Sequence, residues 1–273
     1  MRRFVVLIFF CTPPLFTFSQ YWEAGLLGGL SAYSGDLTQT LVDVKEIHPA
    51  GGVIVRYNVN QWYSIKANIL YGTISGDDAN SSVFSMNYRN LSFTSSLLDI
   101  GVQAEINLLG YWSGHPRYKQ TPYLLFGFSV YRFNPKAQYN GQWYELQPLG
   151  TEGQGTTKYN EREKYALTQI SLPLGLGYKY AINRWWNIGF EFGYRYTFTD
   201  YLDDVSKTYV ESDILNGINP MSPRLANRTG ERYDPVEYTS VDDRGDPTNN
   251  DWYFFTGFTV SYSILPNACY RFN

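Results

Sequence analysis

Two histidines are the first residues in this sequence that suggest chemistry, because imidazole is the commonest general base in proteins. His48 precedes a proline, and His115 lies between Gly114 and Pro116. Either could serve a membrane protease, esterase or acyltransferase if the fold placed a nucleophile beside it. Neither has a persuasive nucleophile nearby in sequence, and the topology derived below puts them at opposite ends of one barrel. We therefore expect a protein that is not an enzyme; loss of an activity on substitution of either histidine would identify one.

Acidic and glycine-rich segments suggest ion or phosphate binding. Asp200, Asp203 and Asp204 could hold calcium at the base of a loop, but their spacing lacks the turn glycine of an EF-hand. We expect solvated or ion-paired carboxylates there, and whether Asp203 and Asp204 bind an ion stays open. The glycine-rich segment 150–155 has no Gly-Lys-Ser/Thr after it, so it indicates a surface turn. With two His in the chain, we expect no metal or cofactor, and no small-molecule substrate.

Charged residues of both signs interrupt apolar stretches at regular positions. On the predicted inward faces they are Glu23, Asp99, Glu105 and Glu191 against Arg56, Lys66, Lys179 and Arg195. They could line an ion pathway, or they could pair with one another and fill the interior. An eight-stranded barrel is only wide enough for its own side chains, which favours a plug of ion pairs.

The elements that must position these residues alternate apolar and polar side chains with a period of two, which predicts β-strands. Eight segments show the pattern: 22–32, 51–57, 63–71, 98–107, 123–131, 170–180, 186–196 and 252–264. Each has about the length that crosses a bilayer as a tilted strand. Pro173 cannot donate to a β-ladder, so we expect a bulge there.

The connections between these segments alternate strictly between short and long. The short ones are residues 58–62, 108–121 and 183–185, and the long ones are 34–47, 76–90, 133–166 and 198–250. Transmembrane barrels of bacteria keep short turns in the periplasm and long loops outside the cell. The sequence therefore predicts an all-β, eight-stranded antiparallel transmembrane barrel in the outer membrane, with both termini periplasmic.

The start of the chain and its composition agree with this location. Residues 1–19 resemble a cleaved export signal, with Arg2 and Arg3 before an apolar run and with Thr17 and Ser19 before the cut. Residues 20–273 would form the barrel domain. Aromatic residues are 18% of the chain, yet the mean hydropathy is −0.33, as alternating strands require. The net charge of −3 gives no basic surface for nucleic acid.

A soluble β-sandwich or lipocalin-like barrel would also alternate, but with its apolar side chains inward. Two features favour the membrane. The polar faces carry many glycines, which suit a narrow lumen. The apolar faces end in Trp and Tyr, as expected for the aromatic girdles that lie at the lipid headgroups. These girdle residues are Trp22, Tyr57, Tyr63, Tyr71, Tyr178, Tyr180, Trp186, Tyr196 and Trp252.

Several short segments, in this order, resemble the PorG family, the outer-membrane barrel of the type IX secretion system. They are Glu-Ala-Gly at 23–25, Tyr-Ser-Gly-Asp-Leu at 33–37, Gln-Pro-Leu-Gly-Thr-Glu-Gly-Gln-Gly at 147–155, Ser-Leu-Pro-Leu-Gly at 171–175 and Thr-Asp-Tyr-Leu-Asp-Asp-Val-Ser at 199–206. The resemblance implies a non-enzymatic part in protein secretion and gliding, linked to a periplasmic ring of the PorK and PorN type. The rival interpretation is a stand-alone barrel that acts as a surface adhesin or a small-solute porin-like protein.

A partner in the periplasm can touch only the short turns and the termini. The middle turn is the longest and carries Trp112, Arg117 and Tyr118, with Tyr111 beside them. Aromatic and Arg side chains are enriched at the energetic centres of interfaces, so we expect these residues to contact the partner. The tail adds Tyr270, Arg271 and Phe272 on the same side. Tyr111 and Trp112 could instead only anchor the barrel at the headgroup level.

Overall fold

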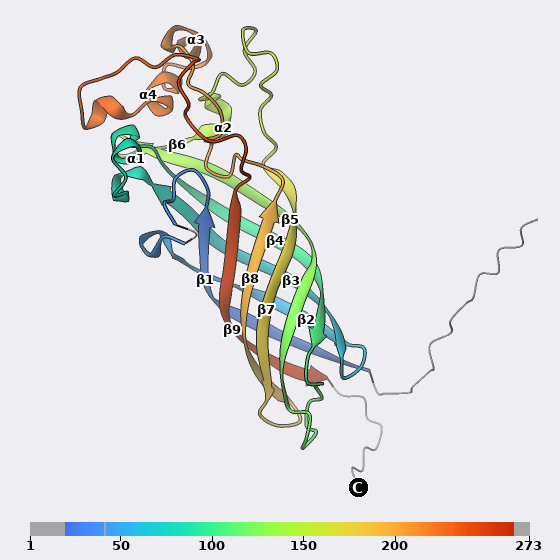
Figure 1. The fold of residues 1–273 in the computed structure, drawn as a ribbon. Coiled ribbons are helices and arrows are strands. Elements are labelled where there is room, and N and C mark those ends of the chain that lie inside the picture. Colours follow the sequence, from blue (N-terminus) through green and yellow to red (C-terminus); the bar gives the residue numbers. More distant parts are fainter. Residues whose placement is uncertain (1–19, 41, 265–273) are drawn as a thin grey trace, which may run out of the picture.

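A computed structural model of the chain describes residues 20–40 and 42–264, so the predicted signal segment and the tail after Ile264 lie outside it. The described residues form a closed antiparallel barrel of eight long strands (Figure 1). These strands are β1 (Tyr21–Ser34), β2 (His48–Asn58), β3 (Tyr63–Asp77), β4 (Ser92–Asn107), β5 (Gln120–Tyr139), β7 (Thr168–Ala181), β8 (Trp186–Thr197) and β9 (Trp252–Ile264). β1 pairs with both β2 and β9, and β4 pairs with β5, which closes the ring. The predicted fold class is confirmed.

The two faces of each strand are those expected from the alternation. Leu26 and Phe128 on the outside are 64% and 71% exposed, whereas the inward Glu105 and Arg195 are fully buried. An apolar outer wall around a buried polar interior is the reverse of a soluble barrel. The period-two pattern therefore predicted the strands, and the glycines of the polar faces together with the Trp and Tyr residues at the strand ends predicted the direction in which the side chains point.

The barrel has two unlike ends, which we call the turn end and the loop end. At the turn end, the connections at residues 59–62, 108–119 and 182–185 are short. In the first and third of these turns, the side chain of Asn60 or Asn183 accepts backbone N–H groups two and three residues later, at 2.7 and 2.9 Å. This self-contained turn chemistry explains how so few residues reverse the chain.

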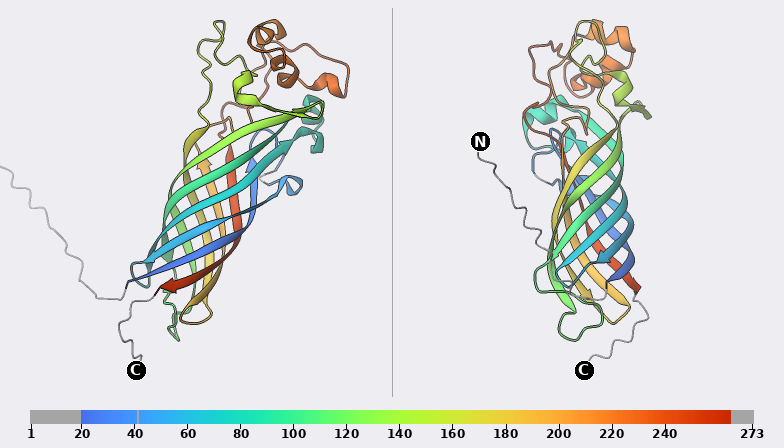
Figure 2. Two further views of the ribbon diagram at one scale, coloured as in Figure 1. Left: turned by 180° about the vertical axis from the view of Figure 1, so that it is seen from behind. Right: turned by 90° about the vertical axis from the view of Figure 1, so that its right-hand side faces the viewer.

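The loop end carries the long connections, and the views of Figures 1 and 2 agree that every labelled helix lies there. The helical segments are η1 (Val44–Glu46), η2 (Asp78–Asn80), α1 (Phe84–Arg89), α2 (Leu146–Leu149), α3 (Ser212–Ile218), α4 (Ser222–Ala226) and η3 (Thr229–Glu231). A short strand, β6 (Gln142–Glu145), pairs with the far end of β5. In the described part of the chain, no helix combines the length and the apolar character needed to cross a membrane.

The main apolar core lies inside the loop-end half of the barrel and continues into the loops. Inward residues there, such as Leu70, Leu97 and Phe133, pack with Leu146 and Leu202 from the third and fourth long loops. We call residues 146–165 and 198–251 the cap. Since the inward face turns from polar to apolar along the barrel, the loop-end half resembles the core of a soluble protein.

Pro173 does not produce the predicted bulge. The register between β5 and β7 is the same on both sides of it, from Phe126 opposite Leu174 to Ser129 opposite Ser171. Only the pairing with β5 is interrupted there, while the pairing with β8 continues through Pro173 and Arg195. The missing N–H is thus accommodated by a gap in one ladder, without an extra residue.

Candidate functional site

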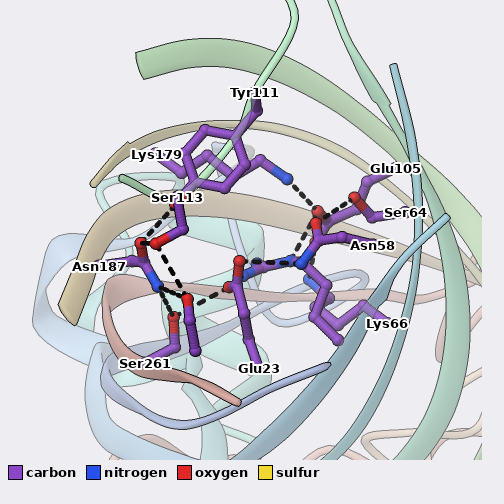
Figure 3. A network of polar contacts seen from close by, with 12 residues as sticks. Glu23, Asn58, Ser64, Lys66, Glu105, Tyr111, Ser113, Lys179, Asn187 and Ser261 are labelled. Atoms are coloured by element: carbon purple, nitrogen blue, oxygen red, sulfur yellow. Dashed lines mark hydrogen bonds and ion pairs between the residues drawn. The ribbon is translucent and has the colours of Figure 1, made fainter. Parts of the chain in front are cut away.

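The turn-end half of the lumen is filled by an ion-pair network centred on Glu105 (Figure 3). Glu105 Oε2 lies 2.8 Å from Arg56 Nε and 2.8 Å from Lys179 Nζ. Arg56 also reaches Glu23 at 2.7 Å, and Asn58 and Ser261 donate to Glu23 at 2.9 and 3.1 Å. Strands β1, β2, β4, β7 and β9 are therefore tied together across the interior.

The other charged residues extend this network along the lumen. Lys66 contacts Glu191, which also accepts a hydrogen bond from Tyr123 at 2.8 Å. Nearer the loop end, Asp99 accepts hydrogen bonds from Asn68, Ser129 and Tyr253 at 2.7–3.0 Å. Arg195 lies 3.5 Å from Asp99.

All eight inward charges named from the sequence lie in this interior, four acids against four bases, with their side chains at most 3% exposed. Removing one member would strand a buried charge, which costs far more than the pair contributes. These charges sum to zero, are paired with one another and are buried, so they fill the lumen as a plug. The alternative of an ion-lined pathway does not fit this packing.

The middle turn closes the turn end from below, which corrects one expectation. Tyr111 was expected on the periplasmic surface, but it is 1% exposed and donates to Asn187 at 2.7 Å inside the lumen. Ser113 is also buried, and its N–H donates to the hydroxyl of Tyr21 at 3.1 Å. The turn folds back because its polar side chains find partners inside the barrel, so it acts as a floor.

The three predicted partner-contact residues share this turn but differ in exposure. Trp112 is half-buried, and its ring packs edge-on against Tyr21 with 5.3 Å between centroids. Tyr118 is half-buried beside the ring of His115, at 4.9 Å. Arg117 is exposed. Arg117 is therefore the member of the trio whose side chain is most open to a partner.

At the loop end, a second polar cluster holds the cap together around Glu152. Its carboxylate accepts the backbone N–H groups of Ser206 and Lys207 at 2.9 and 3.1 Å. Arg244 lies 3.0 Å from it. Glu152 is fully buried and Arg244 nearly so. Backbone N–H groups and a guanidinium together satisfy a carboxylate that would be costly to bury alone.

The three aspartates that were candidates for calcium have separate surroundings in the cap. Asp204 accepts Thr151 and Tyr165 hydroxyls at 2.5 and 2.8 Å, and burial raises its pKa to about 6 although Arg244 lies nearby. Asp203 accepts the hydroxyl of Tyr33 at 2.5 Å. Asp200 is buried, which raises its pKa to about 8. The expectation of solvated carboxylates is wrong, because all three are buried, although Asp204 does pair with Arg244 at 3.7 Å. No metal-binding group of His, Cys, Asp and Glu occurs in the described ranges.

Tyr33 and Asp251 belong to the same cluster and were not singled out from the sequence. The Tyr33 hydroxyl lies 3.1 Å from Asp251, whose other oxygen accepts the N–H of Leu202 at 2.8 Å. Burial and the neighbouring Asp203 raise the pKa of Asp251 well above its usual range. The only signal for this cluster was that Tyr33 and Asp203 lie in two of the segments that carry the family resemblance.

The glycine-rich segment is a turn in the cap, but the expectation of a surface turn is wrong, because residues 150–154 are buried. Gly150, Gly153 and Gly155 have φ values of 57°, 77° and 80°, which glycine adopts without strain. Thr151 and Glu152, between these glycines, point into the buried clusters described above. The segment therefore positions two polar side chains and does not resemble a phosphate loop.

The histidines lie at opposite ends of the barrel, as predicted. His48 Nε2 is 2.6 Å from the hydroxyl of Ser75, which also donates to Glu46. Ser75 is buried and engaged on both sides, so the trio ties the first long loop to β3 and leaves no open approach to the hydroxyl. His115 Nδ1 faces the backbone N–H groups of Arg117 and Tyr118 at 3.1 and 3.3 Å.

The fold and its interior define the class of this protein: a transmembrane β-barrel with a filled lumen and structured long loops. The chain belongs to the family described as "Domain of unknown function (DUF6089)", whose model matches residues 1–216. No curated protein matches it.

Three solved structures are similar in fold at low identity. Ail, the attachment invasion locus protein of Yersinia pestis, is 8% identical with a TM-score of 0.43, over 90% of this chain and 100% of that one. The outer membrane protein OprG of Pseudomonas aeruginosa is 9% identical with a TM-score of 0.41, over 91% and 97%. Neisserial surface protein A is 12% identical with a TM-score of 0.40, over 89% and 96%.

Proposed function

We propose that this protein is a non-enzymatic component of the type IX protein secretion and gliding machinery. It would lie in the bacterial outer membrane and link that membrane to a periplasmic ring of the PorK and PorN type. The observation that carries the proposal is the filled lumen. Six paired charges fill the turn-end half, Asp99 and Arg195 lie nearer the loop end, and an apolar core fills the rest, so the described residues leave solutes no open path. The turn end and the loop end of the barrel are then the surfaces through which the protein would contact its partners.

The orientation follows from the connections. In bacterial barrels, short turns face the periplasm and long loops face the outside. An even number of strands returns the chain to the side on which it started. The turn end, both termini and the exposed Arg117 would then face the periplasm, and the cap would face the medium.

The resemblance to the PorG family supports the role in secretion, and the structure gives its motifs a common place. Residues 33–37, 147–155 and 199–206 meet in the cap, where Tyr33 bonds Asp203 and Glu152 bonds the backbone at Ser206. Residues 23–25 contribute Glu23 to the lumen network. Three of the five matching segments thus meet in the cap, whereas residues 23–25 belong to β1 and residues 171–175 to β7.

Charge reversal in the middle turn tests the docking of the ring. We expect Arg117→Glu to reduce co-purification of the ring proteins and export of secreted cargo, because Arg117 is exposed and its side chain bonds to none of the residues that the structure describes. Trp112 and Tyr118 are tested as conservative changes to Leu and Phe, since both pack against the floor. The matched control is Arg232→Glu, an exposed arginine at the loop end.

Gene deletion separates the proposal from its rival. Loss of export of many cargo proteins, restored by the wild-type gene, supports a secretion component. Export that continues unchanged without this protein, or rings that co-purify equally with Arg117→Glu and with wild type, would refute the proposed role or its docking surface respectively.

The second candidate is a surface adhesin, and the ordered cap is the observation in its favour. Residues 146–165 and 198–251 form a buried polar cluster, and Tyr159, Val210, Leu215 and Ala226 among them form a small apolar core of their own. Such a structured surface suits a binding partner outside the cell. An adhesin predicts normal export in the deletion strain together with reduced attachment of the cells.

A further inference from the structure

A polar pocket of about 530 Å³ lies on the outer wall of the barrel at the loop end. Trp252 of β9 and Tyr196 of β8 form its base on the outward face of the strands, where they pair in register. The first long loop forms one side through Asp36, and the segment before β9 forms the other through Asn249 and Asn250. The lumen and the interior of the cap have no part in it.

The aromatic base of the pocket is held in place by its neighbours. The ring of Trp252 packs edge-on against Tyr194 with 4.5 Å between centroids, and the ring of Tyr196 is 6.3 Å away. Next to it, the carbonyl of Asp251 accepts the hydroxyl of Thr197 at 2.6 Å. A rigid platform loses little freedom when it binds a ligand.

The two polar sides of the pocket are tied to each other. Asp36 Oδ2 accepts the backbone N–H of Asp246 at 2.9 Å. The carboxylate of Asp246 in turn accepts the backbone N–H of Thr248 at 3.1 Å and the side-chain amide of Asn249 at 2.7 Å. The pocket is therefore formed before any ligand arrives, although its sides come from opposite ends of the sequence.

Several polar groups on this lining have no hydrogen-bond partner among the residues that the structure describes. They are the amide of Asn250, the hydroxyl of Ser34 and the indole N–H of Trp252, all half-buried. Together with the free oxygen of Asp36, they offer both donors and acceptors beside an aromatic surface. No Lys or Arg lines the pocket.

From this combination we infer that the pocket binds a pyranose ring of a sugar. The C–H bonds of a pyranose face meet the negatively charged face of an aromatic ring, while the hydroxyls bond to amides and a carboxylate. A phosphate would favour cationic surroundings, and no Lys or Arg is among the described residues that line the pocket. The ligand is thus a neutral or amino sugar.

The position of the pocket points to a lipid-borne sugar as its source. Its base is on the outward side of the strands, nearer the loop end than the exposed apolar residues Phe258 and Val260 of β9. If the loop end faces outward, as the proposed function holds, this is the level at which the core sugars of lipopolysaccharide lie. The inference that the sugar belongs to a lipid rests on that orientation. The inference that the pocket binds a sugar does not.

Binding is tested on the full mature protein in an amine-oxide detergent, since sugar-based detergents would compete. The probes are intact rough lipopolysaccharide, lipid A without core sugars, and the free core oligosaccharide, each titrated by native mass spectrometry. The variants are Trp252→Leu, which removes the platform, and Asn250→Ala, which breaks no hydrogen bond of the described fold. Trp186→Leu is the matched control, because Trp186 is an outward tryptophan at the turn end.

We expect intact lipopolysaccharide to bind more tightly than lipid A, and Trp252→Leu to weaken binding of the core oligosaccharide by about ten-fold. Asn250→Ala should weaken it as well, and Trp186→Leu should leave it unchanged. Equal binding of lipid A and lipopolysaccharide, unaffected by either variant, overturns the site. Binding of the free oligosaccharide alone supports the sugar site and overturns the lipid source. None of these measurements depends on export, so failure here leaves the secretion role to its own test.

Discussion

Glu105 is the residue whose removal most directly tests the plugged lumen. In Glu105→Gln, Arg56 keeps its contact with Glu23 at 2.7 Å, and Lys66 keeps Glu191. Lys179 has Glu105 as its salt-bridge partner in the described structure, at 2.8 Å, so it becomes a buried cation without an anion. Breaking a buried pair in this way costs about 3–5 kcal/mol.

The lower end of this range is expected for Glu105→Gln. Lys179 Nζ also lies over the rings of Tyr111 and Tyr123, at 4.8 and 5.0 Å from their centroids. These cation–π contacts remain in the variant and continue to stabilise the charge of Lys179 in part. We therefore expect the free energy of unfolding to fall by about 3 kcal/mol.

Two further variants make the test specific. Glu105→Gln combined with Lys179→Met removes both members of the pair and should recover at least half of the lost stability, because no unpaired charge remains. Gln103→Leu is the control, since the amide of this inward neighbour has no hydrogen-bond partner among the described residues. It should change stability by less than about 1 kcal/mol.

Reversible urea unfolding in lipid vesicles, followed by tryptophan fluorescence and extrapolated linearly, gives these free energies. If Glu105→Gln stays within about 1 kcal/mol of wild type, or if the double variant is no more stable than the single one, the plug argument fails.

Three other predictions follow from the same structure. In whole cells, cysteine at exposed Arg184 of the turn end should be shielded from an impermeant thiol reagent, while cysteine at exposed Val241 of the cap should react; the opposite pattern would invert the proposed orientation. Reconstituted protein should show no stable large conductance in planar bilayers, and steady open-pore currents would contradict the filled lumen. Because burial raises the pKa of Asp200 from 3.8 to about 8, the folded cap binds this proton more tightly than the unfolded chain, so cap stability should fall as pH rises through this interval. Limited proteolysis from pH 5 to 9 measures this loss, and Asp200→Asn should flatten it; an unchanged pH profile in the variant would refute the assignment.

The barrel could be predicted from the sequence because the patterns that specify it lie within single strands and single connections. A period of two fixes which side chains share a face, and the strict alternation of short and long connections fixes the order of strands. The eight inward charges were identified for the same reason, since each stands out against an apolar pattern. Their partners were not, because Lys66 and Glu191 are 125 residues apart and meet only across the closed barrel.

The cap could not be predicted in this way. Glu152 and Arg244 are 92 residues apart in loops that have no periodic pattern, and their contact depends on the path of two long loops. Tyr111 was predicted on the surface because it lies in a turn, and the sequence of a turn does not reveal that the turn folds back into the lumen. Pro173 was expected to need a bulge, whereas losing part of one ladder proved sufficient.

The ion pairs of the lumen also bear on how the barrel enters the membrane. Lys66 on β3 meets Glu191 on β8, and Glu105 on β4 meets Lys179 on β7, so neither pair joins neighbouring strands. In a half-assembled open sheet of β1 to β4, Glu105 could still pair with Arg56, but Lys179 and Glu191 on the later strands would lack these partners, and burying them unpaired in lipid would be prohibitive. Closing the barrel, which pairs β1 with β9, brings β3 and β4 opposite β8 and β7 and so pairs their charges. Insertion of this barrel should therefore be a concerted event, in which a chain lacking any one strand is rejected as a whole.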